Sequence, residues 1–516
     1  MTAPPPKEST QGVEAYSAVA NAMKLASSLV VSFGITIAVR QFFIPRTLGT
    51  ERFGELNFAD GFAGLFLVAA WLGIDTWMRK ELGVTLKSAD GIWGGVAVVR
   101  TVMGIVLTGA MVVTLKLLGR SDEIIIMAVV FAIAQLMIMT QNTASALLHA
   151  AGKVGGLSVV NIVGKLMWAA IVIPALFLNL PLMWLAVAFL VSETFKALTS
   201  AWLAKVHTDV TLRVDVKAAW RAIKDSTPFW VNNIALVGTG RADVALVGSL
   251  AVGILGSTTA ADREIGWYTL VLGIAGMLMV VIPVIGWVLL PLLSRAIVRG
   301  EEEAAVIIRR AVEVCVVLGA PLSIGGFVAA DELIALYKPE YAPSALVLKI
   351  MSFTFALTYL NVVAANCLAA LGRGWTVTLT SISTLLITPL LDLIFVPPAL
   401  RTWGPGYGAA ACALAIVIAE IFTTSVMLRS MGRLAVDRRL LSVTGRTLVT
   451  CLAVIGVDFA LKRFVPGLNG WLRVALDAVT YVTLALVTKS VRIAEARAFV
   501  QLAKAQRSAR GAEAPA

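Results

Sequence analysis

Two ionisable residues interrupt an apolar stretch of the sequence between Asn232 and Leu250. Arg241 and Asp243 stand near its middle, where each would cost at least roughly 2.5–3.5 kcal/mol at the centre of a lone membrane helix. Residues two positions apart point about 200° away from each other around a helix, so these side chains must find different partners. A guanidinium can hold phosphate oxygens in bidentate fashion, and a buried carboxyl can take up and release a proton. The spacing therefore predicts an anion-binding residue at Arg241 and an ion-coupling residue at Asp243.

The alternative to an anion-binding role is a structural interpretation of Arg241. In it, a buried acid on another helix, such as Glu193 or Glu420, neutralises Arg241 and fixes the helix packing. Glu193 and Glu420 are also ion-coupling candidates together with Asp243, because they lie inside apolar stretches as well. For each of the three acids, a simple salt bridge to a nearby cation is the alternative.

Other basic residues inside apolar stretches extend the predicted anion site. We expect Arg40, Arg100 and Arg241 to contribute guanidinium groups and Lys165 to act as a point charge. All four precede residue 250, whereas the second half of the chain has few basic residues at comparable depth. The sequence therefore predicts that the anion is held mainly by the amino-terminal half.

The composition determines which elements position these side chains. The chain has 516 residues, of which 59% are hydrophobic and 14% charged, with a mean hydropathy of +0.87. A bilayer core about 30 Å thick needs roughly 20 mostly apolar residues per helix, and the absence of ten-residue alternation excludes a barrel. We therefore predict an all-α polytopic membrane protein with about fourteen spans. The predicted spans are 21–44, 56–78, 91–117, 124–148, 155–178, 182–205, 227–250, 265–293, 305–330, 343–370, 375–397, 407–430, 441–462 and 469–489.

The loops between these spans indicate the orientation. Lys and Arg collect in alternate loops, above all between Lys205 and Lys224 and after Lys489, and cytoplasmic loops are the ones that carry this excess. Both termini are therefore expected in the cytoplasm. The net charge of +12 is explained mostly by topology, which argues against a nucleic-acid-binding protein.

An internal repeat indicates the domain organisation. The segment Phe53–Phe66 matches Ile265–Leu278 at one constant offset, with Gly54 aligned to Gly266. The offset equals six predicted spans, which is typical of transporters built from two parallel repeats. The predicted parts are a disordered leader at 1–20, a first six-helix lobe at 21–205, a cytoplasmic linker at 206–226 that lies on the membrane surface, a second six-helix lobe at 227–430, two extra spans at 441–489 and a basic tail at 490–516.

Several kinds of chemistry are disfavoured. The two histidines are expected at the cytoplasmic side, and the four cysteines fall inside spans without zinc or disulfide spacing, so no metal and no cofactor is predicted. A Gly-rich nucleotide loop with a lysine is not present, which argues against ATP as the direct energy source. The predicted external loops are short and contain few acids, so an enzyme such as a glycosyltransferase or polymerase is less favoured than a transporter.

The residues also resemble a known family. The segment Arg46–Leu56 (RTLGTERFGEL) resembles the LG-x-x-x-[FY]-G signature of the bacterial polysaccharide transporter family. Arg241-x-Asp243, Ile265–Tyr268 and Pro283–Arg295 are similar to the start of that family's second lobe. This family comprises O-antigen and exopolysaccharide flippases within the multidrug/oligosaccharidyl-lipid/polysaccharide exporter superfamily, and the resemblance covers about residues 20–430.

The resemblance implies two lobes around a central cavity in the bacterial inner membrane. It also implies translocation of an undecaprenyl-diphosphate-linked oligosaccharide by alternating access, with membrane lipids and a polysaccharide polymerase among the expected partners. A lipid II flippase or a multidrug antiporter of the same superfamily is the alternative, although cationic drugs favour acidic rather than basic cavities.

Overall fold

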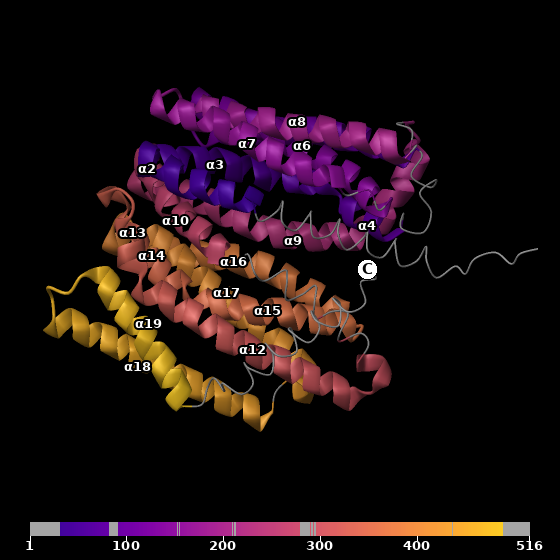
Figure 1. The fold of residues 1–516 in the computed structure, drawn as a ribbon. Coiled ribbons are helices and arrows are strands. Elements are labelled where there is room, and N and C mark those ends of the chain that lie inside the picture. Colours follow the sequence, from indigo (N-terminus) through magenta and orange to yellow (C-terminus); the bar gives the residue numbers. More distant parts are fainter. Residues whose placement is uncertain are drawn as a thin grey trace, which may run out of the picture. The chain divides into compact units, whose positions relative to one another are not determined.

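The computed structural model describes residues 31–81, 91–278 and 296–488, together with Leu289 and Leu293, except for positions 152, 154, 209, 211, 212 and 436. Throughout these residues the regular secondary structure is helical (Figure 1), which confirms the predicted all-α class. The predicted leader at 1–20 and the basic tail at 490–516 lie outside the described residues.

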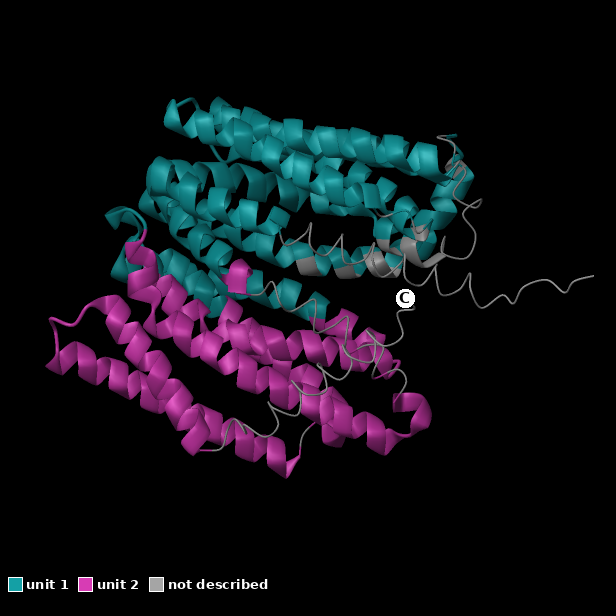
Figure 2. Ribbon diagram, in the orientation of Figure 1, with its two compact units in different colours: residues 1–274, 337–344, 381–415 teal, residues 275–336, 345–380, 416–516 magenta. Residues whose placement is uncertain are grey.

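The chain forms two compact units, which Figure 2 distinguishes by colour. Unit 1 comprises residues 1–274, 337–344 and 381–415, and unit 2 comprises residues 275–336, 345–380 and 416–516. The predicted lobes follow the internal repeat instead, and their boundaries remain a prediction.

The helices of unit 1 include all those that carry the predicted basic residues. They are the π-helical segment η1 (Ile37–Phe43), α2 (Ile44–Leu48), α3 (Thr50–Leu67), α4 (Ile74–Glu81), α5 (Ile92–Leu117), α6 (Asp122–Ala150), α7 (Gly155–Phe177), α8 (Met183–Thr208), α9 (Val216–Leu255) and most of α10 (Thr258–Leu278). Two long helices, α16 (Gly374–Trp403) and α17 (Tyr407–Met431), contribute to both units. The remaining helices belong to unit 2: α12 (Glu301–Val328), α13 (Ala330–Ala335), α14 (Ser344–Met351), α15 (Phe353–Ala370), α18 (Arg438–Phe464) and α19 (Gly470–Val487).

Eleven helices in the described residues are long and apolar enough to cross a membrane, and each coincides with a predicted span. The other three predicted spans fall on the segment that includes η1, on α8 and on α10, and residues 21–30 of the first and most of 279–293 of the last lie outside the described residues. The last two carry several charges, with Glu193 and Lys196 in α8 and Asp262–Glu264 in the first turns of α10. The chain is therefore a multi-pass membrane protein.

Packing in unit 1 brings α3, α6, α7 and α8 side by side, with α6 against both α3 and α8 (Figure 1). Small residues on these helices, such as Ala128, Ala144 and Ala186, are fully buried. Small side chains at such positions let membrane helices approach closely. In unit 2, α12 packs against α15 and α18, and α18 packs against α19.

Much of the segment predicted as a linker, 206–226, is helical, because α8 ends at Thr208 and α9 begins at Val216. Asp215 caps α9 by accepting hydrogen bonds from the backbone N–H groups of Lys217 and Ala218, and the helix then continues without a break to Leu255. Ala219 is buried in the core of unit 1, whereas Trp220 is 68% exposed. Ala219 in this segment therefore packs against the protein, and the position of the segment on the membrane surface stays a prediction.

The glycines of the internal repeat contact each other's helices. A Cβ added to Gly54 on α3 would overlap the backbone carbonyl oxygen of Asp262 on α10, and one added to Gly266 would overlap that of Thr50. Thr50 and Asp262 are related by the same sequence offset as Gly54 and Gly266. Such a reciprocal contact is what a local two-fold axis produces, so this pair of helices supports the predicted repeat.

A buried ion pair secures α10 close to this contact. Arg120, which precedes α6, places Nη1 2.7 Å from Oδ1 of Asp262, and the two side chains are only 1% and 2% exposed. The guanidinium of Arg120 also lies 4.0 Å from the ring centroid of Phe58 on α3. One desolvated interaction thus joins α3, α10 and the loop before α6, and neither charge has access to water.

The next acid along α10 holds a different helix. Glu264 accepts hydrogen bonds from the backbone N–H groups of Gly406 and Ala409, the latter at 2.8 Å. These donors belong to the amino-terminal end of α17, where a negative charge is stabilised by the helix dipole. Glu264 therefore caps the amino-terminal end of α17.

In unit 2, an ionic network holds the two extra helices. Asp331 on α13 contacts Lys349 on α14 at 2.7 Å and Lys462 on α18 at 3.4 Å. Arg473 on α19 lies 3.0 Å from Asp458 on α18. Partial burial alone would raise the pKa of Asp331, but the hydrogen bond and charge of Lys349, aided by Lys462, hold the pKa below its usual value.

The buried pair between Arg120 and Asp262 gives a stability prediction. Asp262→Asn leaves the Arg120 guanidinium buried without its counter-charge, which should lower the free energy of unfolding by about 3–5 kcal/mol. Thermal unfolding of the purified protein in detergent measures the change. Glu51→Gln is the control, because it breaks the exposed pair with Arg263 and should cost no more than about 1 kcal/mol. Equal shifts in Tm for the two variants would contradict the assignment.

Candidate functional site

Two of the predicted cations share one buried carboxylate in unit 1. Asp60 on α3 lies between Arg40 on η1 and Arg241 on α9. Nη2 of Arg40 is 2.7 Å from Oδ2 of Asp60, and Nη1 of Arg241 is 3.4 Å from Oδ1. Arg241 also donates a hydrogen bond of 3.1 Å to the backbone carbonyl of Asp60. We refer to these three residues as the Arg40–Asp60–Arg241 triad.

The triad keeps a positive charge and remains partly open. Two guanidinium groups face one carboxylate, so the net charge is +1. The Asp60 side chain is 6% exposed, whereas those of Arg40 and Arg241 are 37% and 31% exposed. Each guanidinium has five N–H donors, and Asp60 and Asn57 use only some of them. The triad therefore has an excess positive charge that is partly open to solvent.

Gly64 on α3 allows the Arg241 side chain to approach that helix closely. A Cβ on Gly64 of α3 would lie 2.9 Å from the guanidinium carbon of Arg241, closer than side chains normally pack. The absence of a side chain at Gly64 lets the guanidinium lie against α3 and reach the carbonyl of Asp60, one turn earlier. The acid that pairs with Arg241 is therefore Asp60, a buried acid on another helix as the structural interpretation expected, whereas the suggested Glu193 pairs with Lys196.

A pocket adjoins the triad within unit 1. Its cavity volume is about 30 Å³, and Arg40, Asn57 and Asp60 form its polar side. Its other walls are mostly aromatic and aliphatic side chains from α3, α6, α7 and α8, including Trp168. Lys165 lies behind one of these walls, with Nζ 5.4 Å from the ring centroid of Trp168, and it interacts electrostatically with Arg40.

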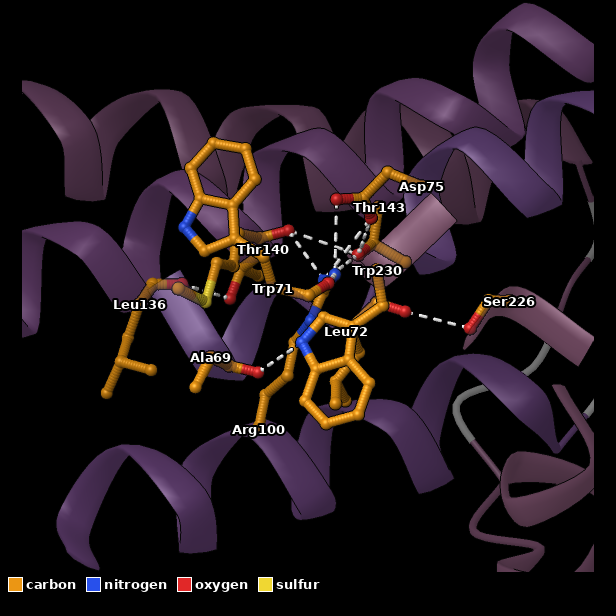
Figure 3. Close-up of polar contacts among 11 residues, drawn as sticks. Ala69, Trp71, Leu72, Asp75, Arg100, Leu136, Thr140, Thr143, Ser226 and Trp230 are labelled. Atoms are coloured by element: carbon orange, nitrogen blue, oxygen red, sulfur yellow. Dashed lines mark hydrogen bonds and ion pairs between the residues drawn. The ribbon is translucent and has the colours of Figure 1, made fainter. Parts of the chain in front are cut away.

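Arg100 belongs to a separate, closed network, which Figure 3 shows. Its guanidinium contacts both oxygens of Asp75 at 3.1 and 3.3 Å and donates to the backbone carbonyls of Trp71 and Met139 at 2.6 and 3.1 Å. Thr143 bridges the pair by donating to Asp75 at 2.7 Å. The Arg100 side chain is buried, so its surroundings favour a structural role, and its predicted contact with an anion stays a prediction.

Asp243 faces a second buried carboxyl group. Oδ2 of Asp243 accepts a hydrogen bond of 3.0 Å from the hydroxyl of Tyr268 on α10. Its carboxyl group also interacts with that of Asp392 on α16, which in turn contacts Cys412 on α17. Both carboxyl groups are fully buried, and Oδ1 of Asp243 and both oxygens of Asp392 are left without a donor if both groups are ionised. A proton shared between the two carboxyl groups would satisfy them.

Sequence reasoning did not find this arrangement. Asp392 was recognisable as an acid inside an apolar span, but it is far from Asp243 along the chain, and nothing in its spacing indicates the pairing. Tyr268 stands in the repeated segment on α10 and gave no functional signal. Only the packing of α9, α10 and α16 identifies these residues as neighbours.

The other two predicted coupling acids have different surroundings. Glu193 lies 2.6 Å from Lys196, one turn further along α8, and both side chains are buried. Glu420 on α17 accepts a hydrogen bond from Asn361 on α15 in unit 2. Glu193 therefore has the salt bridge that the alternative interpretation predicted. Among the described residues, no group of three His, Cys, Asp or Glu side chains is arranged to hold a metal ion.

The Arg100 network can be tested by a double-mutant cycle. Arg100→Met and Asp75→Asn each leave one buried partner unpaired, so each should lower the free energy of unfolding by about 3–5 kcal/mol. The double variant should lose less than the sum of the two, because it removes both charges together. Thermal unfolding in detergent measures all three. If Arg100→Met keeps the wild-type Tm, the network is not what stabilises this region.

Comparison with known proteins gives a consistent picture of the fold. No protein-family model matches the chain, and no curated protein matches it by sequence. Among solved structures, it is similar to the lipid II flippase MurJ in an inward closed conformation, with a TM-score of 0.62 and 14% identity over 85% of this chain and 96% of that one.

It is also similar to multidrug resistance MATE family transporters of the MOP superfamily. An inward-facing one matches with a TM-score of 0.60 and 15% identity over 79% of this chain and 95% of that one. An outward-facing one matches with a TM-score of 0.54 and 17% identity over 79% and 93%. The chain therefore has the helical fold that these membrane transporters share.

Proposed function

We propose that the protein is a flippase for lipid-linked oligosaccharides, in which Arg40 and Arg241 hold the diphosphate that joins sugar to lipid. The substrate is an undecaprenyl-diphosphate-linked repeat unit of O-antigen or exopolysaccharide. It moves from the cytoplasmic to the periplasmic leaflet of the bacterial inner membrane by alternating access. Both termini face the cytoplasm, and a polysaccharide polymerase receives the product.

The observation that carries this proposal is the Arg40–Asp60–Arg241 triad. The anionic diphosphate of such a substrate cannot cross hydrocarbon unaided. Two guanidinium groups that converge on one carboxylate offer it a positive site with free N–H donors. Asp60 keeps the two cations in place when the site is empty. The substrate phosphate then competes with Asp60 for donors, which prevents the substrate from being held too tightly.

Lys165 and Arg100 have lesser parts in the proposal. Lys165 adds positive charge behind Trp168 and steers the anion toward the triad. Arg100 is retained as a predicted contact, although its closed network favours a structural role.

The charge of the triad also helps to choose between the candidate functions. A multidrug antiporter for cationic compounds needs an available carboxylate, whereas Asp60 is already paired with two arginines. A lipid II flippase would use the same diphosphate chemistry, and the similarity to MurJ in fold keeps it as the second candidate. An enzyme is less favoured, because the solved structures that share the fold are described as transporters or flippases.

We further propose that Asp243 couples transport to an ion gradient together with Asp392. Their carboxyl groups interact in a fully buried place, and Tyr268 fixes the orientation of Asp243. A shared proton is held only while the site is closed to water, so changing access to the site exchanges it. Glu193 is less suited to this role because Lys196 already neutralises it.

Loss of the Arg241 guanidinium should reduce transport. In vesicles reconstituted with the purified protein, Arg241→Ala should slow the flipping of a fluorescent isoprenyl-diphosphate saccharide by at least about tenfold, because a charge-assisted contact to phosphate is lost. Arg241→Lys should be intermediate, since it keeps the charge without the bidentate geometry.

Arg299→Ala is the matched control, because Arg299 is exposed and pairs with Glu303 on the next turn. Complementation of a strain that lacks its O-antigen flippase, and separately of one depleted of its lipid II flippase, separates the two candidates. Wild-type rates in Arg241→Ala would refute the role of the triad.

The coupling proposal is tested with gradients across the same vesicles. Asp243→Asn and Asp392→Asn should each abolish the acceleration of flipping by an imposed pH gradient, because neither variant can form the shared-proton pair. Asp122→Asn, at the exposed start of α6, is the control and should respond like the wild type. A full response to the gradient in Asp243→Asn removes this residue from the coupling role.

A further inference from the structure

The first turns of α9 carry three basic side chains and a tryptophan on one exposed face. The exposed residues are Lys217, Trp220, Arg221 and Lys224. Their positions correspond to i, i+3, i+4 and i+7, which lie in one line along a helix. The opposite face packs into unit 1, where Ala219, Ala222 and Ile223 are buried in the core. We refer to the four exposed residues as the α9 basic stripe.

The neighbouring helix α5 indicates the depth of the stripe in the membrane. A Cβ added to Gly95 on α5 would lie 2.6 Å from Cβ of Ala219, so these two turns are in contact. The backbone N–H of Asp215 also donates a hydrogen bond of 3.2 Å to the carbonyl of Gly91, one residue before the apolar span of α5 begins. The first large apolar side chain of α5 that is exposed is Val98, at 46%. The stripe therefore lies level with the edge of the lipid-facing surface, where hydrocarbon meets headgroups.

The residue types of the stripe fit this level. The Trp220 side chain is 68% exposed, and a tryptophan favours the membrane interface because its ring is apolar and its N–H is polar. Basic side chains close to a membrane are attracted to anionic phospholipids, and their long stems let the charges reach the headgroups. A soluble protein is a less suitable occupant, because headgroups already fill the space at this depth.

We propose that the α9 basic stripe binds anionic phospholipids, with the Trp220 ring among the headgroups and the three basic side chains against their phosphates. The occupant is the lipid surface of the leaflet that is expected to be cytoplasmic. Because α9 continues without a break from the stripe to Arg241, the lipid surface anchors the first turns of the helix that carries this member of the triad. The proposal does not depend on which substrate the protein carries.

Fluorescence quenching by brominated lipids tests the proposal. The full-length protein is placed in vesicles made of equal parts of phosphatidylglycerol, which is anionic, and phosphatidylcholine, which is neutral. Bromine is attached to the acyl chains of only the first lipid in one preparation and of only the second in the other. The difference between the wild type and Trp220→Phe isolates the signal of Trp220. Brominated phosphatidylglycerol should quench Trp220 at least about twofold more strongly than brominated phosphatidylcholine.

The basic side chains are tested in the same vesicles. A variant that combines Lys217→Gln, Arg221→Gln and Lys224→Gln should be quenched about equally by the two lipids, because the charges that attract the anionic headgroup are gone. Raising the salt concentration should also reduce the preference of the wild type, since the Debye length falls from about 10 Å at 0.1 M to about 3 Å at 1 M.

A matched control removes the same charge elsewhere. The control combines Arg429→Gln, Arg433→Gln and Arg438→Gln, three exposed arginines of unit 2. It should keep the wild-type preference of Trp220 for phosphatidylglycerol. Thermal unfolding of both triple variants and of Trp220→Phe shows whether the core of unit 1 is intact.

Three results would overturn the proposal. Equal quenching by the two lipids in the wild type means that the stripe does not select anionic headgroups. Quenching by neither lipid means that Trp220 faces water. An equal loss of preference in the control variant means that total charge, and not the stripe, attracts the lipid. The proposed function is tested separately by Arg241→Ala, so each proposal can fail without the other.

Discussion

A single carboxylate shared by two guanidinium groups is the interaction on which the proposed function depends. Asp60 joins η1, near the start of the described chain, to α9, about 200 residues later in sequence. A buried carboxylate needs a counter-charge, and in this protein it receives two, so the group as a whole remains positive. Because Arg40 and Arg241 are each about one-third exposed, that excess charge is available to an anion.

Other buried charges in unit 1 show what is different about the triad. The pairs Arg120–Asp262 and Arg100–Asp75 are neutral, and their side chains are almost completely enclosed. Such pairs contribute little net stability relative to apolar residues, but they fix which helices meet because either partner alone is costly to bury. Asp243 and Asp392, by contrast, interact with each other as two acids. Unit 1 thus contains neutral pairs that hold helices, a cationic group suited to binding and an acidic pair suited to exchanging a proton.

The all-helical membrane fold could be predicted from the sequence, because the length and apolarity of a segment are enough to identify a membrane helix. Arg241 and Asp243 were recognisable for the same reason, since charge inside an apolar span requires an explanation. Their partners were not predictable, because Asp60 and Asp392 lie on helices that only tertiary packing brings close. The sequence suggested Glu193 or Glu420 for Arg241, and the absence of a side chain at Gly64 is part of what makes Asp60 the partner instead.

The most direct test of the central claim is a cryo-electron microscopy structure of the protein with a bound isoprenyl-diphosphate saccharide. The account predicts diphosphate oxygens within hydrogen-bond distance of the guanidinium groups of both Arg40 and Arg241, with Asp60 still between them. Diphosphate density at another place, with both arginines contacting only Asp60, would contradict it.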